Sequence, residues 1–220
     1  MLPGVAGALV RRVRDSLFEA RRQVGLQEGV SRKNEEMMRR ILEISRALRS
    51  TAPLDDLFRE IVDGVVEFSG AERAFLLTVD ERGRIRIPVA RSREREPISE
   101  PQQQVSRRIV SEVLEKARSM RITDAGGAYA KAESVVNLDL RSIMCAPMMR
   151  GAMVVGMLYV DNRSRAGQFT GADQELLDIF AAQAAIALEN ARLVREFARD
   201  EKIRVMGNLA GGVAHDFNNL

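Results

Sequence analysis

The longest uninterrupted helical pattern in the chain runs from Ala172 to about Ala198 and contains no proline or glycine. Along it, a stripe repeats at alternating steps of four and three residues: Leu176, Phe180, Gln183, Ala187, Asn190, Val194 and Phe197, widened by Ile179, Ala182 and Ile186. Such a helix is about 40 Å long. One small domain cannot bury a stripe of that length. We therefore expect its far half to pack on its own copy in a parallel, dimeric coiled coil.

The phase of this stripe is lost across residues 198–202 and resumes at Ile203. A charged phase break between two helical patterns is a place where the packing of a coiled coil can switch. Glycines 207, 211 and 212 follow, and each costs about 1 kcal/mol in a helix relative to alanine. By pattern alone, this last segment is predicted to be a loop.

The composition predicts a packed core. The chain has 220 residues, of which 45% are hydrophobic and 30% charged, which fits one domain with extensions or two small domains. A single cysteine excludes a disulfide framework, and with a single histidine we expect no metal site. The absence of tryptophan argues against a surface that stacks bases or sugars.

The charged residues are distributed unevenly along the chain. The net charge is +3, but residues 1–34 alone carry seven Lys or Arg against three acids. We interpret 1–34 as a basic amphipathic N-terminal helix or linker and expect no nucleic-acid binding. No stretch reaches the roughly 20 apolar residues that cross a bilayer, and the N-terminus has the reverse charge order of a signal peptide. The expected location is therefore cytoplasmic, with no transmembrane segment.

The remaining patterns predict an α+β fold. Helical periodicity is found over 35–50, 54–68 and 105–118, and strand-like runs over 73–79, 84–90, 120–123, 141–149 and 152–160. A long irregular connection, 124–140, precedes the last two strands, and loops of that length are often functional. Hairpin-joined strands with helices before and after them favour an antiparallel sheet with helices packed on it.

This order of elements over residues 36–195 resembles a GAF domain, a small-molecule-binding sensor module. The resemblance is carried by GMLYVDN (156–162), by Phe169-Thr170 with Asp173, and by LLDIFAAQAAIALENARL (176–193). It implies a GAF sensor domain over 35–195 with flanking helices. It also implies a small-molecule ligand, held between the sheet and the 124–140 connection, whose binding residues the sequence does not identify.

Some cyclic-nucleotide-binding GAF domains carry a signature that this chain matches only in part, with Asn162, Arg163, Phe169, Asp173 and Gln174. Arg163 and Asp173 are expected to form a structural ion pair between loop and helix, without ligand contact. The lone cysteine, Cys145, lies in an apolar run where a thiol is usually inert packing.

The C-terminal residues MGNLAGGVAHDFNNL (206–220) resemble the phosphoacceptor box of sensor histidine kinases. The resemblance assigns His215 as the phosphoacceptor, Asp216 as the acid beside it and Asn219 as the polar residue four positions on. An imidazole near neutral pKa can attack the γ-phosphoryl group of ATP, and an adjacent acid can orient the ring. On a helix, residues four apart share a face.

Together these features predict residues 196–220 as a signalling helix and the start of a phosphoacceptor helix. The implied protein is a dimeric two-component histidine kinase with a response regulator or receiver domain as partner. The chain holds no cofactor motif, so Mg-ATP is expected for an ATP-binding domain beyond Leu220, and the chain is expected to be a fragment. Two alternatives stay open: a ligand-free GAF relay module, and the GAF domain of a transcription regulator or cyclic-nucleotide signalling protein.

Overall fold

The structure is a computed structural model that describes residues 53–125 and 138–218, with the side chains of α6 described to Phe197 and at Arg199. The predicted N-terminal segment 1–34, the predicted helix 35–50 and most of the 124–140 connection lie outside the described residues. None of the described helices combines the length and the apolar character needed to cross a membrane.

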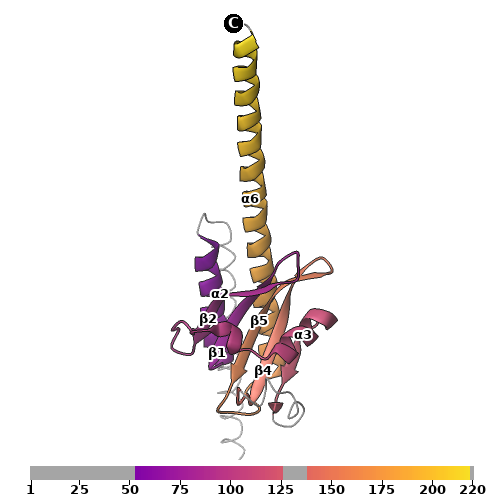
Figure 1. The fold of residues 1–220 in the computed structure, drawn as a ribbon. Coiled ribbons are helices and arrows are strands. Elements are labelled where there is room, and N and C mark those ends of the chain that lie inside the picture. Colours follow the sequence, from indigo (N-terminus) through magenta and orange to yellow (C-terminus); the bar gives the residue numbers. More distant parts are fainter. Residues whose placement is uncertain (1–52, 126–137, 219–220) are drawn as a thin grey trace, which may run out of the picture. The chain divides into compact units, whose positions relative to one another are not determined.

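The described chain forms one five-stranded antiparallel sheet with helices before, between and after its strands (Figure 1). The elements, in chain order, are α2 (Leu54–Ser69), β1 (Arg73–Val79), β2 (Ile85–Ser92), the 3-10 helix η1 (Pro101–Gln103), α3 (Arg107–Lys116), β3 (Met120–Ile122), β4 (Ser142–Arg150), β5 (Met153–Asn162) and α6 (Gly171–Asn218). The strands lie in the order β2-β1-β5-β4-β3. The predicted α+β class, all five strands and their antiparallel pairing are confirmed.

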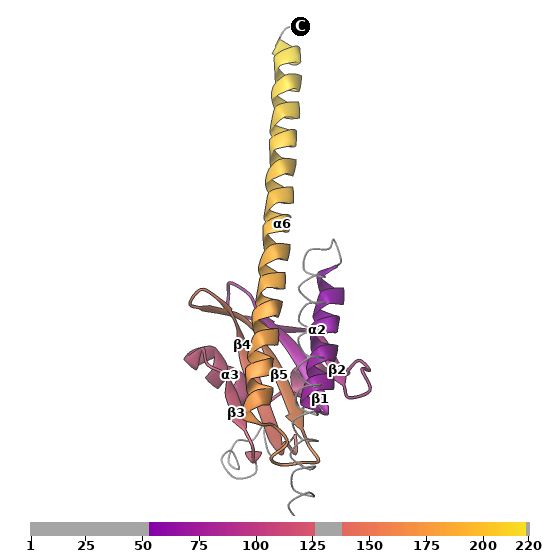
Figure 2. The same cartoon turned by 180° about the vertical axis from the view of Figure 1, so that it is seen from behind.

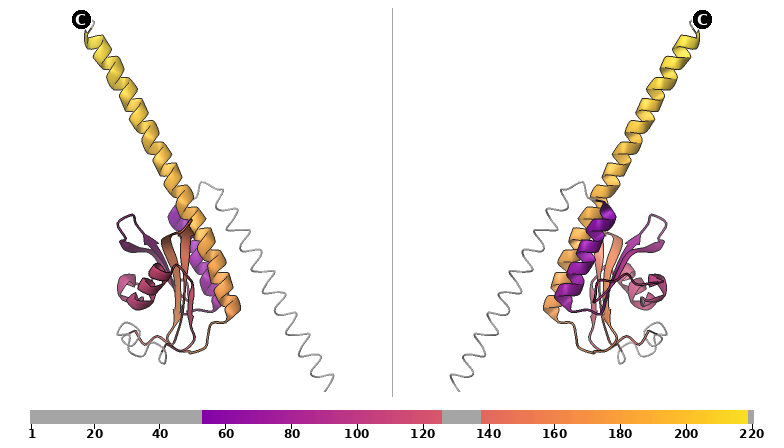
Figure 3. Two further views of the ribbon diagram at one scale, coloured as in Figure 1. Left: turned by 90° about the vertical axis from the view of Figure 1, so that its right-hand side faces the viewer. Right: turned by 90° about the vertical axis from the view of Figure 1, so that its left-hand side faces the viewer.

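The helices cover the two faces of the sheet unequally. Figure 3 shows α2 and α6 on one face and α3 on the other, and Figure 2 shows α2 and α6 side by side in front of the strands. Helix α2 buries Phe58 and Ile61, and the first half of α6 buries Phe180 and Ala184. The ring of Phe68 on α2 lies 6.3 Å from that of Phe180 on α6. The paired helices therefore form one compact layer.

The structure explains why the GMLYVDN run begins with a glycine, Gly156. A Cβ atom built there would lie 2.4 Å from the backbone oxygen of Leu77 and 2.8 Å from Sδ of Met148. The backbone of β1 and the Met148 side chain of β4 therefore occupy the space that a side chain at position 156 would need. Beside Gly156 the β4–β5 register shifts at Met148/Met149. A bulge of this kind bends the sheet.

Helix α6 has two apolar faces where the sequence suggested one wide stripe. Leu176, Phe180 and Ala187 are buried in their own domain. A second set is exposed, and its exposed fraction rises along the helix: Ile179 39%, Ile186 48%, Leu193 51%, Val194 69% and Phe197 75%. The face that remains for a partner is therefore narrower than predicted.

The backbone of α6 is helical without interruption to Asn218. The expectation of a loop over the glycines at 207, 211 and 212, made from the pattern alone, is wrong. The charged segment 198–202 is helical as well.

Candidate functional site

The family resemblance predicts a ligand between the sheet and the 124–140 connection, most of which lies outside the described residues. Ala125 and Leu140 of that connection belong to the apolar cluster on the sheet face under α3, so this face is the candidate site. Strand pairing aligns one row of side chains across it: Ala90, Phe75, Tyr159, Cys145 and Met120. Phe75, Tyr159 and Cys145 are completely buried. Helix α3 contributes Ile109 and Val113, also completely buried, to the same cluster. In the part of the chain that the structure describes, apolar side chains thus fill the layer between sheet and α3.

Tyr159 contributes the only hydroxyl group of that row. Its ring meets Phe75 edge-on at 5.7 Å, and its hydroxyl accepts a hydrogen bond of 3.4 Å from the backbone N–H of Ser106. Ser106 is the N-cap of α3, where its side-chain oxygen accepts from the N–H of Ile109. Burial raises the pKa of Tyr159 well above its usual value, so the phenol stays neutral.

Cys145 lies beside Tyr159 on β4 and is completely buried. Burial raises the pKa of its thiol far above the usual value. Because the thiolate is the reactive form, this thiol is inert while it is covered. That agrees with the interpretation of Cys145 as packing.

A buried ion pair lies at the end of the same face. Arg73 of β1 donates from Nε and Nη2 to the two carboxylate oxygens of Asp161 on β5, both at 2.7 Å. Arg73 also donates from Nη1 to Oε1 of Gln104 at 2.8 Å, and Arg163 donates to that oxygen from Nη2 at 3.0 Å. Asp161 is completely buried. Paired burial in this geometry satisfies both charges.

The residues that follow Asp161 fasten the end of β5 to the start of β1. Asn162 accepts through Oδ1 from the N–H of Glu72 at 2.5 Å, and Glu72 accepts from the N–H groups of Arg163 and Ser164. Burial acts to raise the pKa of Glu72, but hydrogen bonds from Ser164 and Arg163 outweigh it and lower that pKa. The run Asp161-Asn162-Arg163 is thereby explained as a structural corner.

Thr170 and Asp173 cap the start of α6 reciprocally. The N–H of Asp173 donates to Oγ1 of Thr170 at 3.2 Å, and the N–H of Thr170 donates to Oδ2 of Asp173 at 2.9 Å. The Arg163–Asp173 ion pair stays a prediction. Arg163 contacts Gln104 and Glu72, and Asp173 contacts Thr170.

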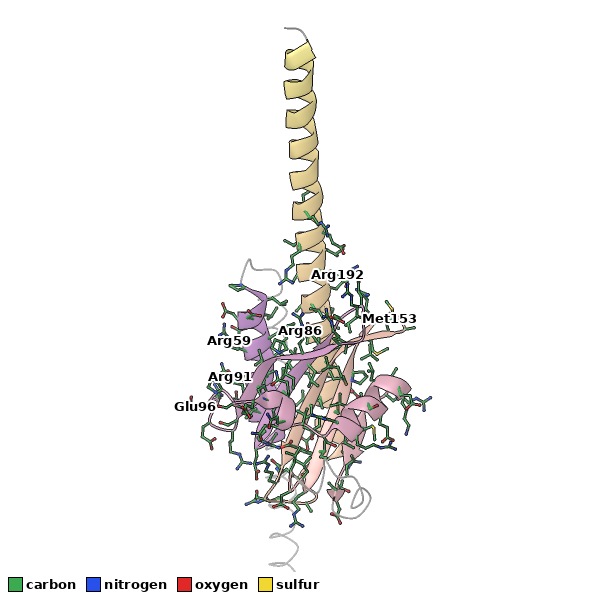
Figure 4. All side chains as sticks on the ribbon, in the orientation of Figure 1. Arg59, Arg86, Arg91, Glu96, Met153 and Arg192 are labelled. Atoms are coloured by element: carbon green, nitrogen blue, oxygen red, sulfur yellow. The ribbon has the colours of Figure 1, made fainter. Side chains whose placement is uncertain are left out.

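An open groove of about 1370 Å³ lies where the two hairpins end. Arg86 of β2, Met153 of β5 and Arg192 of α6 all line it and lie at the same end of the sheet (Figure 4). Here Arg150, the last residue of β4, pairs with Glu189 of α6 at 3.2 Å, and Arg192 pairs with the same carboxylate at 3.2 Å. This cluster joins the sheet to α6 two residues past Ala187.

The predicted phosphoacceptor residues lie near the C-terminal end of α6, far along the helix from the sheet. His215 and Asp216 belong to α6, whose backbone is helical at both positions, and Asn219 lies outside the described residues. His215 lies 28 positions after Ala187, which corresponds to about 42 Å of helix. The roles of His215, Asp216 and Asn219 stay predictions.

Sequence reasoning missed Arg73, Gln104 and the Arg150–Glu189 pair. Arg73 opens an otherwise apolar strand, RAFLLTV, and Asp161 closes another, so a charge at the end of each of two neighbouring strands was the available signal. Nothing in the polar segment 91–104 singles out Gln104 among three consecutive glutamines.

Comparison with known proteins identifies the family to which the fold belongs. The GAF domain family matches residues 53–188, inside the predicted domain of 35–195, whose outer limits stay a prediction. A comparison with curated protein sequences finds no match.

Solved structures agree on the fold. The GAF domain of an Acinetobacter phosphoenolpyruvate-protein phosphotransferase is 19% identical, with a TM-score of 0.56 over 71% of this chain and 95% of that one. The phycocyanobilin-bound GAF domain of a cyanobacterial phytochrome is 14% identical, with a TM-score of 0.57 over 71% and 96%. Residues 122 to 287 of a methyl-accepting chemotaxis protein are 19% identical, with a TM-score of 0.53 over 69% and 98%.

Proposed function

The chain belongs to the GAF family of small-molecule sensing and signalling modules, and from that premise we propose that it is the sensory part of a two-component histidine kinase. In this proposal, a small molecule acts on the GAF domain and α6 carries the response to His215. The observation that supports it most is the continuity of α6. One helix packs on β4 and β5 through its first turns and extends without a break through His215.

The exposed face of α6 supports a parallel homodimer as the signalling form. Ile179, Ile186 and Leu193 repeat every seven residues, and Gln183, Asn190 and Phe197 lie between them at the intervening positions of a heptad. A polar residue such as Asn190 at a core position of a coiled coil fixes register and favours two strands. In a parallel pair, both copies of His215 lie at the same end.

Phosphoryl transfer is the step assigned to the C-terminal segment. A neutral imidazole nitrogen of His215 attacks the γ-phosphorus of ATP, the bond from γ-phosphorus to the bridging oxygen breaks, and ADP leaves with that electron pair. Asp216 orients the imidazole or accepts its proton. An ATP-binding domain of the kind found in histidine kinases would supply the ATP and its Mg²⁺, and the phosphoryl group would then pass to a response regulator or receiver domain.

Autophosphorylation tests this assignment. The chain joined to the ATP-binding domain of a histidine kinase is expected to take acid-labile phosphate from radiolabelled ATP, and His215→Gln is expected to abolish the label. Label that persists in His215→Gln contradicts the assignment. An Asp216→Asn variant that keeps the label but gains it more slowly supports the positioning role of Asp216.

A ligand-free relay is the second candidate, and the filled layer under α3 favours it. Phe75, Tyr159, Ile109 and Val113 are completely buried there within one apolar cluster. Native mass spectrometry of freshly purified chain separates the two. A bound small molecule supports sensing, and its repeated absence supports relay.

A further inference from the structure

We propose that Gln104 is a latch that holds α3 on the sheet, and that its release opens the face beneath α3 to an uncharged, largely apolar ligand. This inference rests on the proposed sensor function and names both the regulation of that site and the class of molecule it accepts. It follows from three observations: where Gln104 is held, what it holds, and what lies underneath.

Gln104 is held by two cations at once. Its side-chain oxygen accepts from Arg73 at 2.8 Å and from Arg163 at 3.0 Å, and its backbone oxygen accepts from Arg73 at 3.4 Å. Arg73 is itself fixed to Asp161 by two bonds of 2.7 Å. Hydrogen bonds from charged donors are stronger than those between neutral groups. The segment before α3 is therefore anchored on the charged cluster of Arg73, Asp161 and Arg163 at the end of this face.

What Gln104 holds is the N-terminal end of α3. Val105 and the N-cap Ser106 follow it directly, and both are buried. The next tie is the long bond of 3.4 Å between Ser106 and the Tyr159 hydroxyl. The other end of α3 is fixed differently. Ala117 takes a left-handed conformation with φ of 49°, and the chain then enters β3, which pairs with β4.

These two ends define the direction of opening. The C-terminal end is tied through β3 to the sheet, whereas the N-terminal end depends on side-chain contacts. Loss of the Gln104 contacts removes the ties of this end to Arg73 and Arg163, and α3 then depends on its apolar packing and on the contacts of Ser106, among them the 3.4 Å bond to Tyr159. We expect α3 to swing away from its N-terminus, with Ala117 near the pivot.

The face beneath α3 selects for ligand charge. Among the described residues, the buried cluster there consists of apolar side chains with the Tyr159 hydroxyl and the Cys145 thiol. The nearest buried carboxylate, Asp161, is already paired with Arg73. A charged ligand that enters this apolar cluster loses its hydration, which is costly. An uncharged apolar molecule gains by covering the exposed surface.

Cys145 makes the opening measurable, because it is the only cysteine of the chain and lies in this buried cluster. The experiment follows the labelling of Cys145 in the whole chain by N-ethylmaleimide, an uncharged thiol reagent, at constant pH. Gln104→Ala is expected to raise the labelling rate several-fold. Gln103→Ala is the matched control, since Gln103 is exposed one residue away, and it is expected to label at the wild-type rate.

The Gln104→Glu variant distinguishes loss of the latch from a general loss of folding. A carboxylate between Arg73 and Arg163 strengthens the latch, so this variant is expected to label more slowly than wild type. Equal rates in Gln104→Ala and Gln103→Ala overturn the proposal. A Gln104→Glu variant that labels as fast as Gln104→Ala also overturns it, because any change at the position would then open the domain.

Two dyes test the ligand class. Nile red, which is uncharged, is expected to bind Gln104→Ala more tightly than wild type, and the anionic dye anilinonaphthalene sulfonate is expected to gain much less. An equal gain for both dyes contradicts the preference for uncharged ligands. These outcomes are separate from the sensor proposal, because a chain that carries a bound molecule while its labelling ignores Gln104 refutes the latch alone.

Discussion

Arg73 and Asp161 lie directly opposite each other on β1 and β5, and their side chains are joined by two parallel hydrogen bonds of 2.7 Å. The pair occupies the polar end of an otherwise apolar face. It holds two central strands together, and through Gln104 it holds the segment that leads into α3. One ion pair thus connects the sheet to the helix that covers the candidate ligand site.

Breaking this pair from one side is expected to be severe. Asp161→Asn leaves Arg73 as a buried cation without its counter-charge, which costs about 3–5 kcal/mol of unfolding free energy. The double variant Arg73→Met/Asp161→Leu removes both charges and is expected to recover most of that loss. Denaturant unfolding followed by circular dichroism measures both. A double variant as unstable as Asp161→Asn would show that charge burial is not the cause.

Gly156→Ala tests the close contact of Gly156 with the backbone of β1 and the side chain of Met148. The added methyl group meets the backbone oxygen of Leu77 and the sulfur of Met148, so overpacking is expected to cost about 1–3 kcal/mol. Gly171→Ala is the control, since a Cβ atom there meets nothing within 4 Å. The two melting temperatures are compared with wild type. Similar values for both variants would contradict the steric explanation.

The contact between Glu189 and the hairpin is expected to depend on pH. Hydrogen bonds from Arg192 and Arg150 lower the pKa of Glu189 below its usual value of 4.5. The stabilisation is therefore present above that value and is lost as pH falls through the lowered pKa. Wild type should melt above Glu189→Gln at neutral pH, and the two curves should converge in acid. A difference that is constant with pH would mean that the carboxylate charge plays no part.

The exposed heptad positions Ile179, Ile186 and Leu193 of α6 form the seam of the proposed dimer, and they predict the oligomeric state. Ile186→Glu puts a charge in the proposed interface and is expected to weaken the dimer in sedimentation equilibrium. Arg195→Glu also introduces an acid on α6 but lies away from the seam, and it is expected to leave the dimer intact. Because both positions are exposed in the domain, both variants should keep the wild-type circular dichroism spectrum. A monomeric wild type at working concentration would refute the dimer.

Much of the fold could be predicted because local patterns and tertiary packing agree. The strand over 73–79 matches β1 to the residue, and the capping pair Thr170 and Asp173 was recognisable from residue type and spacing. Alternation and turn residues carry this information locally.

The rest depended on contacts between distant residues. No spacing rule pairs Arg73 with Asp161, 88 positions away, or selects Gln104 from its neighbours. The stripe of α6 was also ambiguous, because periodicity identifies apolar positions without saying which face meets the sheet. The packing of α6 on β4 and α2 divides the stripe into two faces. Phe180 is buried against the domain, and Ile186 is exposed.

The central claim is that α6 transmits the state of the GAF domain to His215 as one continuous paired helix. Two insertions after Arg199 test it, in the chain joined to a histidine kinase ATP-binding domain, with phosphate on His215 as the readout. Seven added residues preserve the heptad phase and are expected to keep the wild-type level of label. Two added residues turn the segment beyond them by about 200° and are expected to change that level several-fold. Wild-type labelling of both insertion variants would contradict transmission through the helix.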